Sequence, residues 1–394
     1  MSLLALTDTQ LEVQQMARAY AQRALVPLAA ERDREARFDR DMVTGMAELG
    51  FFGMLIPEAY EGLGLDPQSY LLALEEIAVA DASAAVLLSV HNSLPTQMIL
   101  HFGSEAQRQR FLPAMARGEA LGAFALSEPE AGSDAGSLRC QAVRDGDDWI
   151  LTGTKAWVSH GSEAGVILCM ARTDTPDARR GSKGISTFIL TPDLPGFHVS
   201  KKEDKMGLRA SPTVQLVFDE CRVPGDRLVG QEGKGLSYAL GSLDHGRLGI
   251  AAQATGIARA ALEASTRYVG ERKQFGKAIG EFQAIQFKLA DMATRITAGR
   301  TLLHTAAAAK HRGETVTRYC SMAKLFATET AMWVTTQAVQ IFGGYGYVAD
   351  YPVERYFRDA KVTEIYEGTS EIQRIVIARE TLAAATASSF TLPD

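Results

Sequence analysis

The segment Ile365–Arg374 is the part of the chain best suited to proton transfer. Ser370 and Gln373 have the Ser-x-x-Gln spacing of a capping box, which predicts that a helix starts at Ser370. Glu367 lies on the turn before that start, and Gly368 beside it has no side chain to block a ligand. One carboxylate on such a turn suits a general base that removes a carbon-bound proton. The alternative is a solvated carboxylate that the helix dipole stabilises.

A second candidate is the segment Phe124–Asp134. Pro129 and Gly132 predict an irregular loop, in which Ser127, Ser133 and free backbone N–H groups point into one space. Such a loop can donate hydrogen bonds to a phosphate or to the rim of a polar heterocycle. A plain serine turn is the alternative.

The segment Lys155–Gly161 is the third candidate. Strand alternation predicts Trp157 and Ser159 on one face and Val158 on the other. An aromatic ring beside a hydroxyl can stack on a planar cofactor and hydrogen-bond to it. A core tryptophan is the alternative.

Two glycine-containing segments near the C-terminus could hold phosphate. In Glu271–Lys277, Arg272 offers a guanidinium fork and Phe275 a stacking face, although a solvated turn at a helix end is equally consistent. Gly344–Ala349 matches the dinucleotide-binding pattern G-x-G-x-x-A. We reject that reading because Pro352 follows closely and no βαβ unit surrounds the match.

The elements that must position these residues change along the chain. Residues 1–120 have helical composition, 121–230 have short strand-like runs, and 231–394 return to long helical periods. Asp145–Asp148 is predicted to be a hairpin turn, Ile56–Gly64 a loop, and Ile185–Leu190 a strand. The plan is therefore three domains in the order helical, β, helical.

Composition excludes several functional classes. The 394 residues carry a net charge of −6, with 46% hydrophobic and 22% charged residues, which does not indicate nucleic-acid binding. No apolar run is long enough to span a membrane. The four cysteines have no metal or redox spacing and are predicted to be buried free thiols. The N-terminus does not resemble a targeting segment, so we expect a cytoplasmic protein, or a mitochondrial matrix protein had a transit peptide been removed.

Together these segments resemble the acyl-CoA dehydrogenase family over essentially the whole chain. Leu243–Arg247 and Ile365–Arg374 are similar to its short-chain, or butyryl-CoA, branch, and Met206–Ser211 resembles the family's β-domain signature. The implied fold is α+β and mainly α. It has an N-terminal helical domain, a central small antiparallel β-barrel or sandwich, and a C-terminal four-helix bundle.

The resemblance also implies a site, with Glu367 as the catalytic base, FAD as the cofactor and no metal. The residues implied to bind FAD are Phe124, Leu126, Ser127, Ser133, Trp157, Val158, Ser159, Arg272, Gln274, Phe275, Gln283, Gln340, Ile341, Phe342, Gly343, Gly344, Thr369, Ser370 and Glu371. Those implied to contact the acyl-CoA are Ser133, Asp244, His245, Gly246, Arg247 and Gly368.

The implied reaction is α,β-dehydrogenation of an acyl-CoA to a trans-2-enoyl-CoA. Glu367 takes the α proton while the β hydrogen leaves as hydride to flavin N5. The Glu367 backbone N–H and an FAD ribityl hydroxyl bind the thioester oxygen. An electron-transferring flavoprotein is the implied acceptor, and the FAD site is shared between subunits of a homo-oligomer, expected to be a tetramer. Short-chain acyl-CoA substrates are expected first, and medium-chain or branched acyl-CoA substrates (isobutyryl, 2-methylbutyryl) are the alternatives.

Four other functions compete with this one. An acyl-CoA oxidase needs an extra helical region, and a nitroalkane oxidase-like enzyme needs Asp where Glu367 stands. An NAD-linked dehydrogenase rests on Gly344–Ala349 alone, and a non-catalytic paralogue would not need the base. The chain departs from the family pattern at His160, where Asn is common, at Glu130, where Gly is frequent, and at Phe282 before Gln283.

Overall fold

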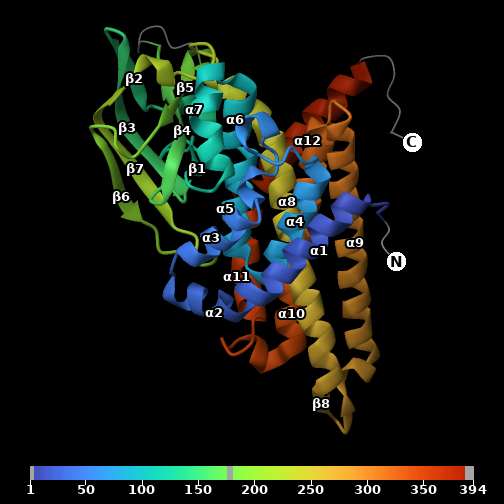
Figure 1. Cartoon of the computed structure of the whole chain (residues 1–394). Helices are drawn as coiled ribbons and strands as arrows, with labels where there is room; N and C mark the ends of the chain where they lie inside the picture. Colours follow the sequence, from blue (N-terminus) through green and yellow to red (C-terminus); the bar gives the residue numbers. More distant parts are fainter. Residues whose placement is uncertain (1–3, 175–180, 387–394) are drawn as a thin grey trace.

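The computed structural model describes residues 4–174 and 181–386 and begins with helices (Figure 1). The N-terminal helices are α1 (Asp8–Tyr20), α2 (Val26–Glu35), α3 (Arg40–Glu48), α4 (Pro67–Ala80), α5 (Ala82–Ser93), α6 (Pro95–Phe102) and α7 (Glu105–Ala116). A π-helical turn at Ala21–Leu25 joins the first two. The loop predicted over Ile56–Gly64 is confirmed, because it lies in the connection between α3 and α4, which contains two short 3-10 turns at Phe51–Gly53 and Glu58–Tyr60.

The middle of the chain forms a seven-stranded sheet, in the order β1-β4-β2-β3-β7-β6 with β5 also paired to β4. Its strands are β1 (Leu121–Ala125), β2 (Gln141–Asp145), β3 (Asp148–Ser159), β4 (Ala164–Arg172), β5 (Ile185–Leu190), β6 (Phe197–Lys202) and β7 (Thr213–Val223). Antiparallel pairs predominate, and the predicted hairpin between β2 and β3 is confirmed. Strand β1 differs from the expected antiparallel pattern, because it pairs parallel with β4.

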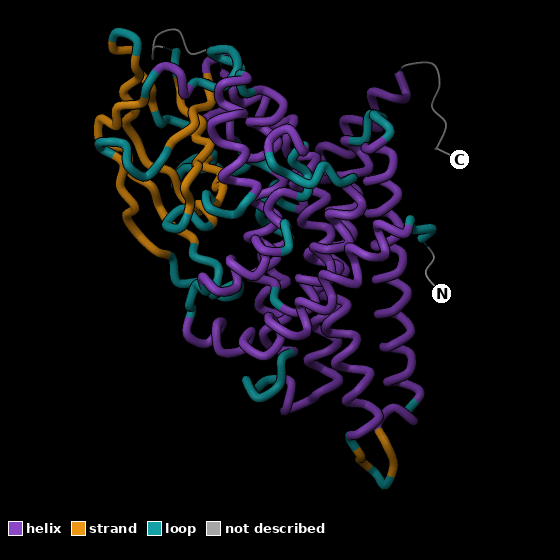
Figure 2. The backbone as a smooth tube through the Cα atoms, viewed as in Figure 1, coloured by secondary structure: helices purple, strands orange, loops and turns teal. Residues whose placement is uncertain are grey.

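Long helices dominate the C-terminal part (Figure 2). They are α8 (Gly235–Glu271), α9 (Gln283–His311), α10 (Thr317–Phe342), α11 (Val353–Thr363) and α12 (Ser370–Thr386). A small hairpin, β8 (Lys273–Gln274) with β9 (Lys277–Ala278), joins α8 to α9. The G-x-G-x-x-A match follows α10 rather than a strand, which confirms that it is not a dinucleotide-binding motif.

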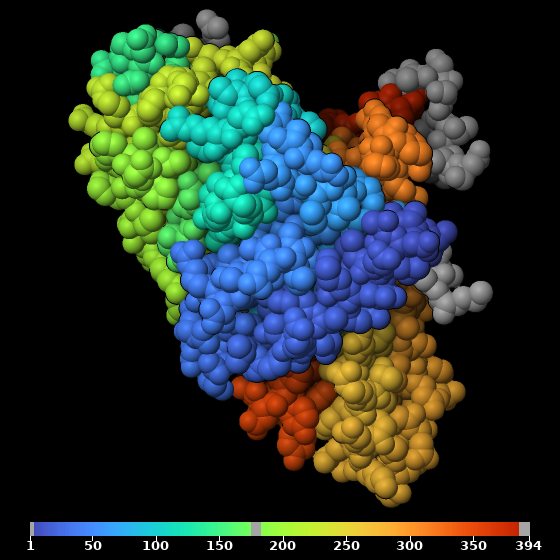
Figure 3. Space-filling view, in the orientation of Figure 1, coloured from blue at the N-terminus to red at the C-terminus, as the bar shows by residue number. Residues whose placement is uncertain are grey.

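Helix α8 packs closely against the N-terminal helices, so the helical parts share one hydrophobic core while the sheet has its own. Small residues on α8 permit this approach. A Cβ at Gly256 would lie 2.5 Å from the Ala78 methyl on α4, and one at Gly249 would lie 2.5 Å from Ser89 Oγ on α5. In Figure 3 the N-terminal helices lie between the sheet and the long C-terminal helices.

Two further predictions concern buried thiols and membranes. All four cysteines are buried and free, as predicted. Within the described residues, no helix combines the length and apolar character of a membrane span. The domain limits at 120/121 and 230/231 stay a prediction, although helices give way to strands between α7 and β1, and strands to helices between β7 and α8.

Candidate functional site

Glu367 lies on a sharp turn between α11 and α12. Its φ is +52° and that of Gly368 is +92°, so two consecutive residues adopt left-handed backbone. A non-glycine residue in this region is uncommon and needs support from its surroundings. Lys324 Nζ donates to the Gly368 carbonyl at 2.8 Å, and Gln373 Nε2 donates to the same carbonyl at 2.9 Å and to that of Glu367 at 3.2 Å. Side chains from α10 and α12 therefore hold the turn.

The helix start predicted at Ser370 is confirmed, but the predicted capping box is wrong, because the capping residue lies one position earlier. Thr369 Oγ1 accepts from the Ile372 backbone N–H at 3.4 Å, so Thr369 caps α12. Ser370 is the first helical residue, and its hydroxyl is buried without a hydrogen-bond partner. Gln373 Oε1, which would accept from the cap N–H in a capping box, has no hydrogen-bond partner, while Nε2 donates to the turn carbonyls of Glu367 and Gly368.

The Glu367 carboxylate has an unusual environment for a charged group. Both of its oxygens are buried, and neither has a hydrogen-bond partner. Burial raises the pKa of Glu367 to about 7, against the opposing effects of Lys324 and Arg247. The group is therefore poised to gain or lose a proton near neutral pH, which is what a general base requires.

Helix α8 brings several predicted substrate residues to this carboxylate. Any Cβ at Gly246 would overlap with the Glu367 carboxylate, so the two residues face each other directly. Arg247 Nη1 donates to Asp244 Oδ1 at 2.8 Å, and Thr317 Oγ1 donates to Asp244 Oδ2 at 2.7 Å. Asp244 thus holds the guanidinium whose charge acts on Glu367.

His245 belongs to the same segment but has a different setting. Its ring lies 6.2 Å from that of His101 on α6, in a stacked arrangement. Burial, with smaller effects of Lys310 and His101, lowers the pKa of His245 to about 3. His245 is therefore neutral at physiological pH.

The N-terminal helices contribute hydroxyl groups that sequence reasoning missed. Tyr70 on α4 and Ser89 on α5 have buried hydroxyls that lie close to each other. Burial raises the pKa of Tyr70, the Ser89 hydroxyl opposes this effect, and the charge of Glu367 adds to it. A Cβ at Gly249 would lie 2.5 Å from Ser89 Oγ and 3.5 Å from Tyr70 Oη, so these hydroxyls lie against α8 one turn from Gly246.

The structure joins the two predicted flavin-facing segments of the β domain. Lys155 is fully buried, and its Nζ donates to Glu128 Oε1 at 2.7 Å and to the Leu126 carbonyl at 3.0 Å. The Ala156 N–H donates to the Ser127 carbonyl at 2.9 Å. The Phe124–Ser133 loop is therefore fastened to β3 immediately before Trp157.

The predicted alternation at the end of β3 is confirmed. Trp157 is 61% exposed, Ser159 is half-buried, and the Val158 side chain is packed in the sheet core. A bulge lies between Lys155 and Val158, and Trp157 has a φ of +60°. An aromatic face is thus available to a ligand, whereas Val158 can offer such a ligand only its backbone.

The Met206–Ser211 segment connects this strand to the base. The buried His160 ring at the end of β3 lies 2.9 Å from Ser211 Oγ through Nε2. The Leu208 N–H donates to Asp359 Oδ1 on α11 at 2.6 Å. The segment is therefore hydrogen-bonded both to the residue that follows β3 and to α11, the helix that precedes the Glu367 turn.

The remaining predicted cofactor residues lie elsewhere. Arg272, Gln274, Ile341, Phe342, Gly343 and Gly344 line a groove of about 550 Å³. Phe275 beside them is 94% exposed, and Gln283 and Gln340 are exposed nearby in the chain. Figure 1 shows the β8–β9 hairpin at the opposite end of the molecule from the sheet. A single chain therefore does not bring this group to Trp157.

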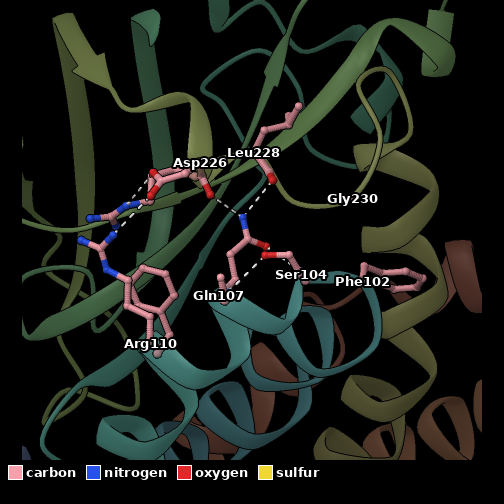
Figure 4. A pocket seen from close by; sticks show the side chains of 11 residues that line it. Phe102, Ser104, Gln107, Arg110, Asp226, Leu228 and Gly230 are labelled. Atoms are coloured by element: carbon pink, nitrogen blue, oxygen red, sulfur yellow. Dashed lines mark hydrogen bonds and ion pairs between the residues drawn. The ribbon is translucent and has the colours of Figure 1, made fainter. Parts of the chain in front are cut away.

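A second cavity, of about 460 Å³, lies between α7 and the segment leading into α8 (Figure 4). Gln107 Nε2 donates to the Asp226 and Leu228 carbonyls at 2.7 and 2.9 Å, and Arg110 lies 3.4 Å from the Asp226 carboxylate. None of the predicted site residues lines it. These bonds fasten α7 to the β domain.

Lys324 was also missed by the sequence analysis, although its position in the sequence carries a signal that could have found it. Lys324 follows Ala323 and precedes Leu325 and Phe326 in an apolar part of α10, and it is fully buried. Lysine is almost never fully buried unless it is paired. A lysine on an apolar helix face therefore indicates a buried acceptor, although not which one.

Comparison with known proteins supports the family resemblance. The N-terminal, middle and C-terminal domain models of acyl-CoA dehydrogenase match residues 7–119, 123–221 and 233–382. The mitochondrial short-chain specific acyl-CoA dehydrogenase of Mus musculus is 47% identical over 373 residues, 95% of this chain and 90% of that protein. Butyryl-CoA dehydrogenase from Megasphaera elsdenii superposes with a TM-score of 0.94 at 44% identity, covering 97% and 100% of the two chains.

A more distant relative carries a reduced flavin. A glutaryl-CoA dehydrogenase from Mycobacterium smegmatis, solved in complex with FADH2, superposes with a TM-score of 0.90 at 31% identity over 98% of this chain and 97% of that one. The predicted family and the mainly helical three-part fold are confirmed. The chain therefore belongs to the acyl-CoA dehydrogenase family and is a flavin-dependent oxidoreductase.

Proposed function

We propose that the protein catalyses α,β-dehydrogenation of a short-chain acyl-CoA to a trans-2-enoyl-CoA, with Glu367 as the base. One observation carries the proposal: the Glu367 carboxylate is buried, lacks a hydrogen-bond partner and faces the side-chain-free Gly246. A structural carboxylate would be paired, because burying an unpaired one is costly. Its pKa of about 7 suits proton abstraction at neutral pH.

The residues present fit FAD. Trp157 offers an exposed ring and Ser159 a hydroxyl on the same strand face, while Ser127 and Ser133 belong to the loop fastened beside them. In the distal groove, Arg272 suits a pyrophosphate, and a Cβ at Gly343 or Gly344 would meet nothing within 4 Å. When bound, FAD supplies the hydride acceptor for the β hydrogen.

The chain's own residues perform the remaining tasks. Glu367 accepts the α proton, and its backbone N–H donates to the thioester oxygen, which stabilises the charge that develops there. The proposed acyl-CoA contacts are Ser133, four consecutive residues of α8 and Gly368, the four being Asp244, His245, Gly246 and Arg247. Thr369 caps α12 and Ser370 and Glu371 begin it, and we propose that these three residues close the site behind the base.

A short acyl chain is the substrate that the relatives favour. The mouse relative is short-chain specific by name, and the Megasphaera relative is a butyryl-CoA dehydrogenase. In this chain, Tyr70 and Ser89 lie against Gly249 on α8, one turn from Gly246. The preference for a butyryl-sized acyl group is proposed from the relatives alone.

We further propose a homo-oligomer, in line with the family resemblance, in which a second copy completes each FAD site. The two groups of cofactor residues lie at opposite ends of one chain, so a second copy is needed to unite them. A tetramer and an electron-transferring flavoprotein as the acceptor follow from the same resemblance. Arg272→Ala should then weaken FAD retention more than acyl-CoA binding, and a dilute monomer that retained FAD fully would contradict the sharing.

The test of the function is anaerobic mixing with butyryl-CoA, followed through the flavin absorbance near ~450 nm. The parent should bleach. Glu367→Gln keeps the shape and removes the proton acceptor, so FAD should stay bound while the bleaching rate falls by about 10²–10⁴-fold. If the variant bleaches at the parent rate, Glu367 is not the base. If the parent bleaches with no acyl-CoA in a chain-length panel, the activity itself is wrong.

A further inference from the structure

We propose that Lys324 is a positioning residue for the base, which holds the Glu367 turn through the Gly368 carbonyl and stabilises the ionised carboxylate through space. The inference rests on the proposed role of Glu367. It adds a residue from α10, 43 positions away in the chain, to the machinery of proton abstraction.

The surroundings of Lys324 carry the argument. The side chain is fully buried, and Nζ donates to the Gly368 carbonyl at 2.8 Å. No carboxylate among the described residues lies within ion-pairing distance of Nζ, whereas a buried ammonium ordinarily requires such a partner. A carbonyl satisfies one donor and leaves the charge uncompensated. The Glu367 carboxylate, equally buried and unpartnered, is the nearby countercharge.

The mutual effect of the two groups has a consistent sign. Burial lowers the pKa of Lys324 to about 8, while Glu367 and Glu364 oppose that effect and Arg247 adds to it. Burial raises the pKa of Glu367, and Lys324 opposes this more than Arg247 does. Each group therefore favours the charged form of the other.

Other charged groups around this pair come from several elements. Arg247 faces it from α8, Glu364 from the end of α11, and Glu371 from the first turn of α12. Tyr70 on α4 has a raised pKa and stays neutral. Lys324 is the cation with the largest effect on Glu367.

The chain provides a matched control at the same atom. Gln373 also donates to the Gly368 carbonyl, at 2.9 Å, but it is neutral. A variant at Gln373 therefore weakens the hold on the turn without changing the charge. A variant at Lys324 changes both.

The experiment compares Lys324→Met with Gln373→Leu in the FAD-loaded protein. The rate of flavin bleaching by butyryl-CoA is measured from pH 5.5 to 9.5, together with FAD content and melting temperature. In Lys324→Met the midpoint of the rate profile should move upward by about one pH unit or more, because a nearby cation has been removed. The rate at pH 7 should fall by about 10-fold or more for the same reason. Gln373→Leu should lower the rate without moving the midpoint. Lys324→Arg keeps the positive charge and should return the midpoint to the parent value.

An unmoved midpoint in Lys324→Met, or equal shifts in both variants, would reduce Lys324 to a structural support and overturn the proposal. Should Lys324→Met fail to fold, Lys324→Gln keeps a donor for Gly368 without the charge and must show the same shift. Failure of the proposed function looks different, since the parent itself would then not bleach with any acyl-CoA.

Discussion

The molecule contains two buried neighbourhoods built from the same residue types, one glutamate and one lysine. In the β domain, Glu128 and Lys155 form a direct ion pair at 2.7 Å. Glu128 also accepts from the Arg139 and Cys140 backbone N–H groups at 2.6 and 2.9 Å. Every charge there has a partner, and the pair serves to fasten a loop to a strand.

In the helical part, the corresponding groups avoid direct contact. Lys324 donates to a backbone carbonyl, and the Glu367 carboxylate has no hydrogen-bond partner. Burial therefore acts on Glu367 without full compensation, and its pKa rises to about 7. The two glutamates share residue type and burial and differ in hydrogen-bond satisfaction, which is the property that the proposed role of Glu367 as a base depends on.

Removing Lys155, the lysine that has a direct ion-pair partner, is the strongest test of this difference. Lys155→Met leaves Glu128 charged and buried, so the free energy of unfolding should fall by about 3–5 kcal/mol. Denaturant unfolding checks this. In the double variant with Glu128→Gln, the loss should be smaller than the sum of the single losses. Additive losses would mean that the two side chains are not coupled.

Removing the unsatisfied Glu367 carboxylate should raise the free energy of unfolding at neutral and alkaline pH, whereas removing Lys155 lowers it. The native pKa of Glu367 is about 7 against an ordinary value of 4.5, so the folded state keeps a proton that the unfolded chain releases. Stability is therefore lost as pH rises from 4.5 to 7, by about 3 kcal/mol at most.

Glu367→Gln lacks this loss. It should match the parent at pH 4 and exceed it at pH 8, by an amount that approaches that difference. Denaturation midpoints at the two pH values measure the effect. A variant less stable than the parent at pH 8 would show that the carboxylate is satisfied after all.

The contact between Gly246 and Glu367 gives a third test. A methyl group at Gly246 would overlap with the carboxylate and displace it, and a displacement of about 1 Å can cost ~100-fold in rate. Gly246→Ala should therefore bleach slowly with FAD still bound. Conversely, Gly246→Glu combined with Glu367→Gly places a carboxylate in the vacated space from the α8 side. It should recover part of the activity lost in Glu367→Gly, and no recovery with any acyl-CoA would count against this geometry.

The smallest expected effect separates two neighbouring hydroxyls at the start of α12. Thr369→Ala removes the cap and should cost about 1 kcal/mol. Ser370→Ala removes a buried hydroxyl without a partner and should change stability by less than about 0.5 kcal/mol. Melting temperatures of the two variants decide which residue caps the helix. A larger loss for Ser370→Ala would restore the capping box that the spacing predicted.

Local sequence patterns predicted much of this protein. Turn residues at Asp145–Asp148 were sufficient to predict the β2–β3 hairpin, and strand alternation was sufficient to place Trp157 and Val158 on opposite faces, because backbone preference and period-two burial act over a few residues. The glycine beside Glu367 marked the candidate base for the same reason. The sequence left open whether Trp157 lies in the core, and the structure shows that it is exposed. The cofactor and substrate contacts named from the family resemblance stay predictions.

Only the tertiary structure decided how that base is supported. The parallel pairing of β1 with β4, the Glu128–Lys155 pair and the reach of Lys324 to Gly368 each join residues that are distant in sequence. The cap is Thr369 rather than Ser370, and Gln373 donates from α12 to the carbonyls of the left-handed turn. The sequence determines which functional groups each residue can contribute to a site. Its pKa and its partners depend on which helices pack around it, and that follows from long-range burial that no local pattern records.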